Sequence, residues 1–298
     1  MAEERMEDIA TPKRTKELLQ KYGFTLKKSL GQNFLIDGNI LRNIVAAAEP
    51  GPDKGMLEIG PGIGALTERL AEASGRVVAV EIDQRLLPVL QESLSAYPNV
   101  TVVHGDILKL DLPALFRKFF GEMKSVSVAA NLPYYITTPI VMKLLENRLP
   151  IESIVIMVQK EVADRFSAAP GGKEYGSLSV AVQYYAVPQM VSRVPHSVFM
   201  PQPNVDSAVV KLSMRKTPPV RLADEGLFFE VVSASFEQRR KTLLNNLQRR
   251  FFNTTEGKDA CRVFLAECGI DPGRRGETLS MQEFAVIANA LHEKGCRV

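Results

Sequence analysis

The stretch EIGPGIGALT, residues 58–67, stands between a short apolar run and an amphipathic one. The run MLEIG (56–60) has the length and apolar content of a buried strand, and the letters after it open a helical pattern. Glycines in a turn from strand to helix let a ligand lie close against the backbone. Because Gly60, Gly62 and Ala65 fit the spacing G-x-G-x-x-G/A, the stretch predicts a nucleotide-binding turn in an α/β fold. The spacing does not separate one nucleotide cofactor from another, and a turn with only a packing role has the same letters.

Strand-like and helix-like segments alternate around this turn, after a tail over residues 1–11 that is expected to be loose. The further expected strands are RVVAVE (76–81), VTVVHGD (100–106), SVSVAAN (125–131) and IESIVIMVQ (151–159). Helical patterns are expected over residues 15–22, 39–48, 65–73 and 84–94, the last one starting or kinking near Pro88. Near-continuous apolar strands that alternate with helices are typical of a parallel sheet covered on both faces.

The pattern changes beyond Gly176. The segment GSLSVAVQYYA (176–186) fits either a helix or a strand, and we favour a helix. PQMVSRV (188–194) and VDSAVVKLSMR (205–215) have the pattern of strands and are joined by a proline-rich turn. Such a pair predicts an antiparallel hairpin at the edge of the parallel sheet.

A linker and a helical region follow. TPPVRLAD (217–224) has two prolines and little apolar content, as interdomain linkers do. The segments after it have helical periodicity throughout. We therefore expect two domains, a larger α/β domain over residues 1–220 and a small all-α domain over residues 221–298.

The composition is that of an ordinary globular chain. Of 298 residues, 45% are hydrophobic and 24% are charged, and the formal net charge is only +3. The three cysteines form no CxxC pair, so we expect reduced thiols, and the three histidines are isolated, so no metal site is predicted. No apolar run has the length of a signal core or of a membrane span. We therefore expect a cytoplasmic protein.

Positive charge gathers in two stretches. Residues 12–31 carry six basic side chains against one acid, and residues 236–250 carry five against one. These basic residues are Lys13, Arg14, Lys16, Lys21, Lys27, Lys28, Arg239, Arg240, Lys241, Arg249 and Arg250. A single stretch of this kind is usually a solvated face, but two of them favour a polyanionic partner.

Two carboxylates stand at strand ends near the glycine turn. Glu81 ends the next strand, about 20 residues beyond Gly60, where a carboxylate can accept the hydroxyl groups of a ribose. Asp106 ends the strand after that and can accept a hydrogen bond from an adenine amino group. The sequence has no repeat typical of a nicotinamide domain and no His/Arg pair for hydride transfer. These features favour S-adenosylmethionine over NAD as the cofactor.

The strand SVSVAAN runs into NLPYYIT (131–137), which holds no His, Cys, Ser or charged side chain. An amino group attached to an aromatic ring is a poor nucleophile, because its lone pair is delocalised into the ring. The Asn131 side-chain oxygen and the Leu132 carbonyl can each accept one N–H of such a group, and Pro133 directs that carbonyl outward. Tyr134 offers a ring on which a planar aromatic substrate can stack. The motif predicts a reaction that depends on positioning; a strand-end turn with a buried tyrosine is the alternative.

These motifs together carry a resemblance to a known family. EIGPGIG, Glu81, HGD and NLPY look like the motif set of amino methyltransferases that act on nucleobases. KKSLGQNFL (27–35) and FMPQPNVDSAV (199–209) make the match close. The chain is similar to the ribosomal RNA adenine N6,N6-dimethyltransferase family, in particular to its small-subunit branch, over motifs that span residues 29–207.

The resemblance implies a Rossmann-like, S-adenosylmethionine-dependent methyltransferase sheet with an antiparallel edge hairpin, and a small all-α C-terminal domain for RNA or ribosome recognition. It implies N6,N6-dimethylation of two adjacent adenosines in the 3′-terminal hairpin loop of 16S rRNA, in the 30S subunit or its precursor. A role in small-subunit biogenesis, a monomeric state and a cytoplasmic location are further implications.

The resemblance also assigns roles that the residues alone do not. It places cofactor contacts at Asn33 and Leu35 in QNFLID, over the sulfonium end, and places Phe199 against the target base. The expected catalytic residues are Asn131, Leu132, Pro133, Tyr134 and Phe199. The expected cofactor-binding residues are Asn33, Leu35, Gly60, Glu81, Asp106 and Asn131.

Two other functions share many of these motifs. One is a 23S rRNA adenine methyltransferase of the macrolide-resistance type, against which GRRGETLS (273–280) and the longer tail argue. The other is a non-catalytic ribosome-assembly factor, against which the intact NLPY and Asp106 argue. A NAD-linked oxidoreductase has the weakest case.

Overall fold

The computed structural model of the chain describes residues 9–23 and 33–296. The chain folds as two compact units. The sheet unit comprises Met1–Ala163 and Val187–Met214, and the helical unit comprises Asp164–Ala186 and Arg215–Val298. The domain boundary after residue 220 remains a prediction, because a compact unit need not coincide with a functional domain.

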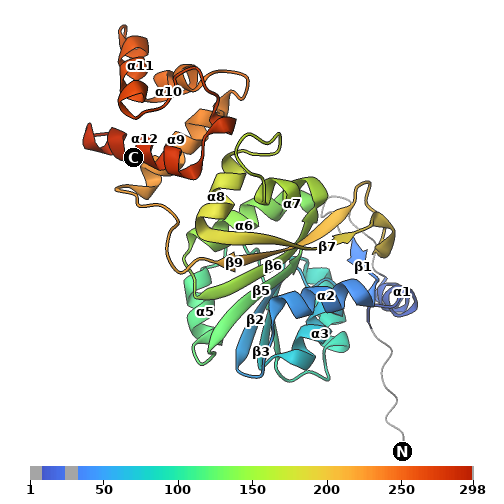
Figure 1. Cartoon of the computed structure of the whole chain (residues 1–298). Helices are drawn as coiled ribbons and strands as arrows, with labels where there is room; N and C mark the ends of the chain where they lie inside the picture. The colour runs from blue at the N-terminus through green and yellow to red at the C-terminus, as the bar shows by residue number, and fades with distance from the viewer. Residues whose placement is uncertain (1–8, 24–32, 297–298) are drawn as a thin grey trace, which may run out of the picture. The chain divides into compact units, whose positions relative to one another are not determined.

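Within the described residues, a seven-stranded sheet forms the centre of the sheet unit (Figure 1). Its strands are β2 (Lys54–Ile59), β3 (Arg76–Glu81), β4 (Val100–His104), β5 (Ser125–Asn131), β6 (Ile151–Gln159), β7 (Ala186–Val194) and β9 (Ser207–Met214). They lie in the order β4-β3-β2-β5-β6-β9-β7. The strands from β4 to β6 are parallel, and β6 pairs with β9 in the antiparallel sense. The predicted parallel sheet with an antiparallel edge is confirmed.

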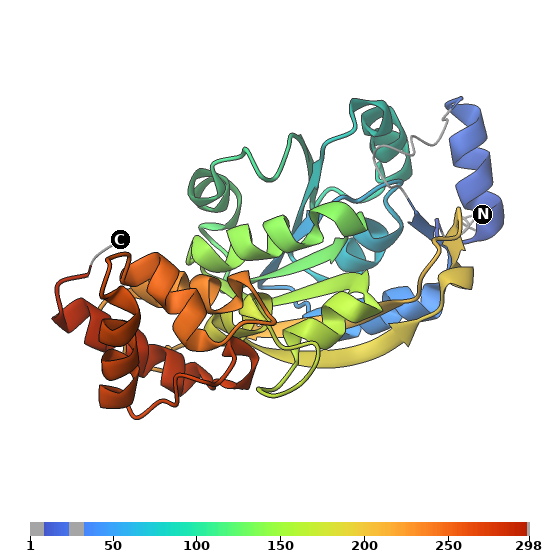
Figure 2. The same ribbon diagram turned by 90° about the horizontal axis from the view of Figure 1, so that it is seen from above.

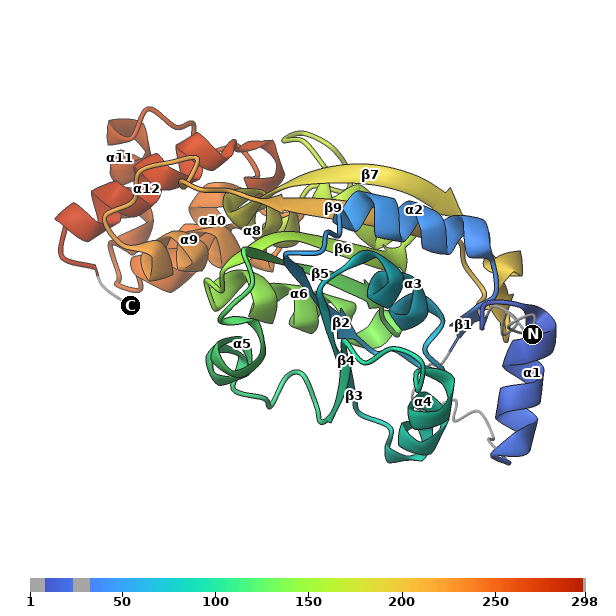
Figure 3. The same ribbon diagram turned by 90° about the horizontal axis from the view of Figure 1, so that it is seen from below.

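Helices cover both faces of this sheet. α2 (Gly38–Ala48), α3 (Ala65–Ala73) and α4 (Leu87–Ser93) pack on one face, and α5 (Leu112–Phe120) and α6 (Thr137–Glu146) lie on the other (Figure 3). The strand interiors are shielded from solvent, as at Leu57, Val78 and Val128. α3 has the bounds that its periodicity predicts, and α4 begins beside Pro88 as expected, since proline is favoured in the first turn of a helix.

The first described residues pack into the core of the sheet unit. Helix α1 (Pro12–Lys21) begins earlier than predicted, because the Thr11 side chain caps it and proline is tolerated at its first position. Ile9 and Ala10, ahead of it, are buried. The loose tail expected at the N-terminus is therefore wrong for these residues, and its first eight residues lie outside the described part of the chain.

A second, two-stranded sheet joins two motifs that are far apart in sequence. β1 (Phe34–Leu35) pairs with β8 (Phe199–Met200) in the antiparallel sense, and Figure 2 shows the blue β1 beside the yellow hairpin that carries β8. Neither strand was predicted from the sequence: β8 lies within the expected proline-rich turn, and two residues are too few for any periodic signal. The letters KKSLGQ of the first motif lie outside the described residues.

The helical unit has its own apolar core. Its longer helices are α8 (Ser177–Tyr185), α9 (Glu225–Glu237), α10 (Leu243–Phe251), α11 (Gly257–Glu267) and α12 (Met281–Glu293). The preference for a helix over residues 176–186 is confirmed, as are the helices expected after the linker. Cys261 is a free, buried thiol in this core. None of the helices described in either unit is long and apolar enough to cross a lipid bilayer.

Candidate active site

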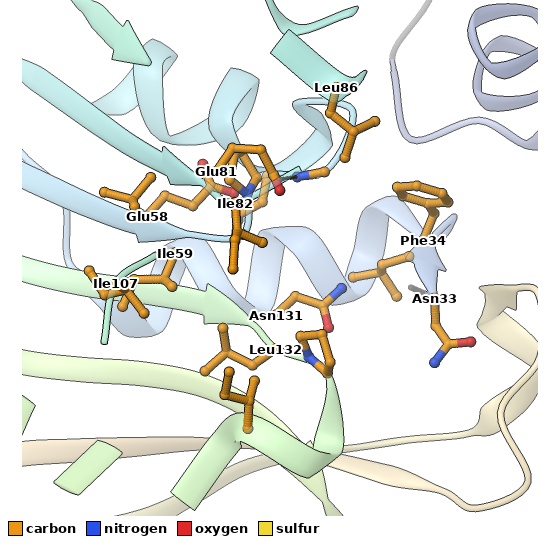
Figure 4. Close-up of a pocket in the computed structure, with 18 of the residues that line it drawn as sticks. Asn33, Phe34, Glu58, Ile59, Glu81, Ile82, Leu86, Ile107, Asn131 and Leu132 are labelled. Carbon is orange, nitrogen blue, oxygen red and sulfur yellow. Dashed lines mark hydrogen bonds between the residues drawn. The ribbon is translucent and has the colours of Figure 1, made fainter. Parts of the chain in front are cut away.

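A pocket opens at the carboxyl ends of the central strands of the sheet unit (Figure 4). Its walls come from the segments after β2, β3, β4 and β5, and from β1 and β8. The strand order changes direction between β2 and β5, and open α/β sheets bind ligands at such a point. The space inside, with the open mouth included, is about 1230 Å³.

The glycine turn leaves its backbone open to this pocket. Gly60 and Gly62 have φ angles of +70° and +61°, which a residue with a Cβ atom adopts only with strain. A Cβ atom on Gly62 would also lie 3.1 Å from the ring of Phe34 in β1. The Phe34 ring therefore fills the space beside Gly62. A Cβ atom on Gly60 would instead have, among the described residues, only the Asn131 carbonyl and the Leu132 side chain within 4 Å, so a ligand can approach the backbone there.

Glu81, at the end of β3, reaches the glycine turn. Its Oε2 accepts a hydrogen bond from the Gly62 N–H (3.3 Å), and its Oε1 accepts one from the Asp83 N–H (2.7 Å). Burial raises the pKa of this carboxyl, and the two N–H donors offset part of that effect. Because each carboxylate oxygen can accept more than one hydrogen bond, Glu81 can bind ligand hydroxyl groups while it holds the turn.

Glu58 is a second carboxyl in the pocket, which the sequence analysis did not single out (Figure 4). It is 1% exposed, and its Oε2 has no hydrogen-bond partner among the residues that the structure describes. Burial raises its pKa to about 8, although the neighbouring Thr67 hydroxyl offsets part of the rise, and the charge of Glu81 adds a smaller contribution. A buried polar atom without a partner is rare and indicates room for a polar ligand group. The sequence feature that could have identified Glu58 is its position two residues before Gly60, the first glycine of the turn.

Asp106 lies in the loop after β4, at another wall of the pocket. Its Oδ1 accepts a hydrogen bond from the Leu108 N–H (2.9 Å), which fixes the carboxylate. Lys143 on α6 donates to the carbonyls of Leu108 and Leu110, at 2.7 and 3.0 Å, and so holds the whole loop. The Asp106 Oδ2 lies 3.9 Å from the Nζ of Lys109, whose side chain is 85% exposed, and it can still accept a hydrogen bond from a donor in the pocket.

Apolar side chains stand next to both strand-end carboxylates. Ile82 follows Glu81 and Ile107 follows Asp106, and both isoleucines line the pocket. Ile82 is 51% exposed, which is unusual for a large aliphatic side chain at the end of a buried strand. The pair provides an apolar surface for a planar ring, and the sequence analysis did not single it out.

After β5, two acceptors of the motif receive no hydrogen bond from the residues that the structure describes. The Pro133 carbonyl accepts hydrogen bonds from the Ile136 N–H (3.1 Å) and the Thr137 hydroxyl (3.2 Å). In contrast, no donor from residues 9–23 or 33–296 bonds to the Leu132 carbonyl or to the Asn131 side-chain oxygen. Figure 4 shows the Asn131 amide pointing toward the side of the pocket formed by Phe34. These two oxygens are therefore available to a ligand N–H.

The two tyrosines of the motif differ in how they are held. Tyr134 is half-buried, and its hydroxyl lies 2.7 Å from the Ser207 Oγ at the start of β9. Burial raises the pKa of this phenol, so it is neutral at physiological pH. Tyr135 also lines the pocket but is 63% exposed. Tyr134 is the tyrosine with a fixed ring.

The β1–β8 pairing brings the remaining predicted residues to the same pocket. Asn33, Leu35 and Phe199 all line it, and Leu35 is the register partner of Phe199. Leu35 and Phe199 are both buried. Phe34, which the sequence analysis passed over, covers Gly62 from the same ladder. All predicted site residues thus meet in one place, while their individual roles remain predictions.

The residues present fit S-adenosylmethionine next to an amino group that accepts a methyl. Carboxylates at two strand ends suit hydroxyl and amino groups, the isoleucines suit a purine, and the Glu58 oxygen needs a polar partner. Asn131 and Leu132 supply acceptors for an amine. Among the residues that the structure describes, none of those lining the pocket is a histidine, cysteine or lysine.

Comparisons with known proteins agree with this site. A family model described as "Ribosomal RNA adenine dimethylase" matches residues 23–293. A protein of Geobacillus thermodenitrificans, "Ribosomal RNA small subunit methyltransferase A", is 61% identical over 284 residues, which are 95% of this chain and 97% of that protein. A protein of the same name from Bacillus mycoides is 59% identical over 286 residues, 96% of this chain and 98% of its own length.

Two solved structures share the fold over most of the chain. A dimethyladenosine transferase from Plasmodium falciparum has a TM-score of 0.74 and 26% sequence identity, covering 88% of this chain and 98% of its own. The 23S rRNA methyltransferase ErmE has a TM-score of 0.65 and 27% identity, covering 87% of this chain and 100% of its own. The fold is that of a Rossmann-like methyltransferase.

Proposed function

The chain belongs to the ribosomal RNA adenine dimethylase family, and from this premise we propose that it dimethylates N6 of two adjacent adenosines in the 3′-terminal hairpin loop of 16S rRNA. It is an S-adenosylmethionine-dependent rRNA adenine methyltransferase. The observation that carries the proposal for the site is the pair of unpartnered oxygens, on Asn131 and Leu132, at the end of β5.

Asn131 and Leu132 are the groups that act on the adenine amine. Each oxygen accepts one N–H, which draws the nitrogen out of conjugation with the ring and turns its lone pair toward the methyl donor. Pro133 keeps the Leu132 carbonyl free, because its own carbonyl takes up the local donors at Ile136 and Thr137. No strong base is required for this step, since alignment of the reacting atoms supplies most of the acceleration.

Tyr134 and Phe199 are proposed to hold the flipped base between them. Stacking of a base on an aromatic side chain is worth about 1–3 kcal/mol. The half-buried ring of Tyr134 follows β5, and Phe199 comes from β8 on another wall of the same pocket. Because two methyl groups are added in turn, the space between these walls has to accept an amine that already carries one methyl.

The remaining residues are proposed to bind the cofactor. Gly60 opens the backbone, Glu81 accepts the ribose hydroxyls, and Asp106 accepts the adenine amino group, while Asn33 and Leu35 cover the sulfonium end. S-adenosylmethionine supplies a methyl group on a cationic sulfur, so the leaving group is already activated. The Glu58 carboxyl, protonated at neutral pH, can donate its proton to a polar group of the cofactor.

The large-subunit alternative is not favoured. Relatives at about 60% identity over nearly the whole chain are named for the small subunit, whereas ErmE is 27% identical. A NAD-linked activity does not fit the family. We further propose that the chain acts as a monomer in the cytoplasm on the 30S particle or its precursor, with residues 221–298 contacting RNA.

The proposal is tested with labelled S-adenosylmethionine and ribosomal particles that lack the modification. Undermethylated 30S and 50S particles are incubated separately with the protein, and the rRNA is digested to nucleosides. We expect N6,N6-dimethyladenosine from the 30S particle alone. Product from the 50S particle would support the large-subunit alternative, and tight 30S binding without any product would support a non-catalytic assembly factor.

A further inference from the structure

The hydrogen bond between Tyr134 and Ser207 joins two strands that are not neighbours. Tyr134 follows β5, and Ser207 is the first residue of β9. In the sheet order β5-β6-β9, the strand β6 lies between them. The bond, 2.7 Å long, therefore passes over the carboxyl end of β6, where Gln159 is the register partner of Ser207. Ser207 is fully buried, so water competes little for its hydroxyl.

The residue before Ser207 is connected to a different wall of the pocket. The Asp206 Oδ1 accepts a hydrogen bond from the His196 backbone N–H (3.0 Å) and lies 2.9 Å from His196 Nδ1. His196 begins the helical turn that leads directly into β8 and Phe199. Asp206 and Ser207 are thus bonded to Tyr134 on one side and to the segment that carries Phe199 on the other.

We propose that Ser207 is a positioning residue, which fixes the Tyr134 ring against the target adenine. This inference rests on the proposed role of Tyr134 as a stacking surface. A tyrosine ring turns about its side-chain torsions between several rotamers unless its far end is held. The Ser207 hydroxyl holds that end and so restricts rotation about the Cα–Cβ bond, which keeps the ring at the wall of the pocket. A base stacked on this ring keeps its amino group within reach of the Asn131 and Leu132 oxygens.

The same sheet contains a matched pair of serines outside the pocket. The Oγ atoms of Ser127 in β5 and Ser153 in β6 lie 3.2 Å apart, and both residues are buried. Neither lines the pocket. Ser153→Ala and Ser207→Ala each remove one buried serine hydroxyl from the sheet, but Ser153→Ala leaves Tyr134 unchanged. Ser153→Ala is therefore the control that distinguishes a loss of stability from a loss of positioning.

The test is a double-mutant cycle in the full-length protein. Ser207→Ala, Tyr134→Phe and the double variant are compared in single-turnover methylation of undermethylated 30S particles at saturating cofactor. Each single change should slow the reaction by about 2- to 10-fold, the loss expected for one neutral hydrogen bond. The double variant should be no slower than the slower single variant, because both changes break the same bond. Cofactor affinity, measured by calorimetry, should stay at the wild-type value in all three.

Three outcomes would overturn the inference. In the first, Ser207→Ala leaves the rate unchanged. In the second, it slows wild type and Tyr134→Phe by the same factor, as a purely structural residue would. The third concerns the control at Ser153. Ser153→Ala should lower the melting temperature about as much as Ser207→Ala but leave the rate constant unchanged. If Ser153→Ala slows the reaction equally, loss of stability explains the effect and the positioning role is wrong.

A further variant separates this inference from the proposed function. Tyr134→Ala removes the stacking ring itself and should slow methyl transfer far more than Tyr134→Phe, which keeps the ring and loses only its anchor. If Tyr134→Ala reacts at the wild-type rate, the stacking role of Tyr134 is wrong. If Tyr134→Ala is slow while Ser207→Ala is not, the function stands and only the role of Ser207 is refuted.

Discussion

Asn131 and Leu132 each present an oxygen to the pocket, while the next carbonyl, that of Pro133, is bonded to Ile136 and Thr137. The local turn therefore supplies hydrogen-bond donors to the Pro133 carbonyl but not to the Leu132 carbonyl or the Asn131 side-chain oxygen. An acceptor that is fixed before the substrate arrives does not have to reorient during the reaction, which is why such groups contribute strongly to rate.

Asn131→Ala should show this contribution directly. The variant keeps the turn but loses the side-chain acceptor, so single-turnover methylation should fall by about 10²–10³, as for other pre-organised hydrogen bonds. Cofactor affinity should fall much less, because Gly60, Glu81 and Asp106 are unchanged. Asn147→Ala, at the end of α6, removes an amide bonded to its own helix and should leave the rate unaltered. A wild-type rate for Asn131→Ala would mean that NLPYYIT is only a structural turn.

The buried carboxyl of Glu58 should make the free energy of unfolding depend on pH. Its pKa rises from 4.5 to about 8 on folding, mainly because the carboxyl is removed from water. The folded chain therefore holds a proton that the unfolded chain has already lost at neutral pH. Between these two values the unfolded state binds fewer protons than the folded state, so stability decreases as the pH rises.

Glu58→Gln should remove this slope, because an amide of the same shape does not titrate. Relative to the variant, the wild-type free energy of unfolding should fall by up to about 1.4 kcal/mol per pH unit between the two pKa values. Denaturant unfolding of both proteins across this pH range measures the difference, and the raised pKa of Glu81 is common to both. Parallel pH profiles would show that Glu58 is ionised in the folded protein.

At the scale of elements, the two-residue strands β1 and β8 close the pocket over the glycine turn. Their ladder is too short to be stable alone, so its position depends on Phe34, Leu35 and Phe199, which are buried in the core of the sheet unit. Phe34 lies where a Cβ atom on Gly62 would go. The turn and the ladder therefore depend on each other.

Gly62→Ala should destabilise both the glycine turn and the β1–β8 ladder. The new methyl group meets Phe34, and a positive φ angle costs an alanine about 1–2 kcal/mol, so the melting temperature and the affinity for S-adenosylmethionine should both fall. Gly171→Ala is a matched control: its φ angle is +84° and its Cβ position is open. It should lower the melting temperature alone. Equal cofactor affinity in the two variants would contradict the role assigned to the glycine turn.

At the scale of the whole molecule, Arg239 differs from its neighbours in the basic stretch of the helical unit, because its exposed side chain is bonded to other groups of the same unit. Arg239 donates to the carbonyls of Lys173 and Tyr175, at 2.8 and 3.1 Å, and pairs with Glu277. The chain thus uses Arg239 to hold its own loops together. Arg240 and Lys241 are exposed, and these two residues are the ones expected to meet RNA phosphates.

Arg240→Gln with Lys241→Gln should therefore weaken 30S binding and make it less sensitive to salt. Each lost phosphate contact should reduce the slope of log K against log salt by about 0.7–0.9. Arg117→Gln with Lys118→Gln removes the same charge from two exposed residues on α5 of the sheet unit and should leave the slope unchanged. Identical slopes for both pairs would mean that the stretch is an ordinary solvated face. Arg239→Ala should instead lower the melting temperature.

The sequence by itself determined the architecture and the chemical character of the site. The strands from MLEIG to IESIVIMVQ and the helices after the linker are as predicted, because each has a periodic pattern long enough to detect. Gly60, Glu81, Asp106 and NLPY were also identified by sequence. Each stands at the end of a predicted strand, and parallel strands bring their carboxyl ends to one edge.

Only the tertiary structure decided which distant segments complete the pocket. Four features depend on contacts between residues that are far apart in the sequence. They are the pairing of β1 with β8, the burial that sets the pKa of Glu58, the bond from Tyr134 to Ser207, and the hydrogen bonds of Arg239 within its own unit. A two-residue strand is too short to show a hydrophobic periodicity, and the identity of a residue as Glu or Arg does not reveal its environment in the folded protein. Burial and hydrogen bonding are properties of the folded neighbourhood, and the same side chain is a solvated charge in one place and a structural or chemical group in another.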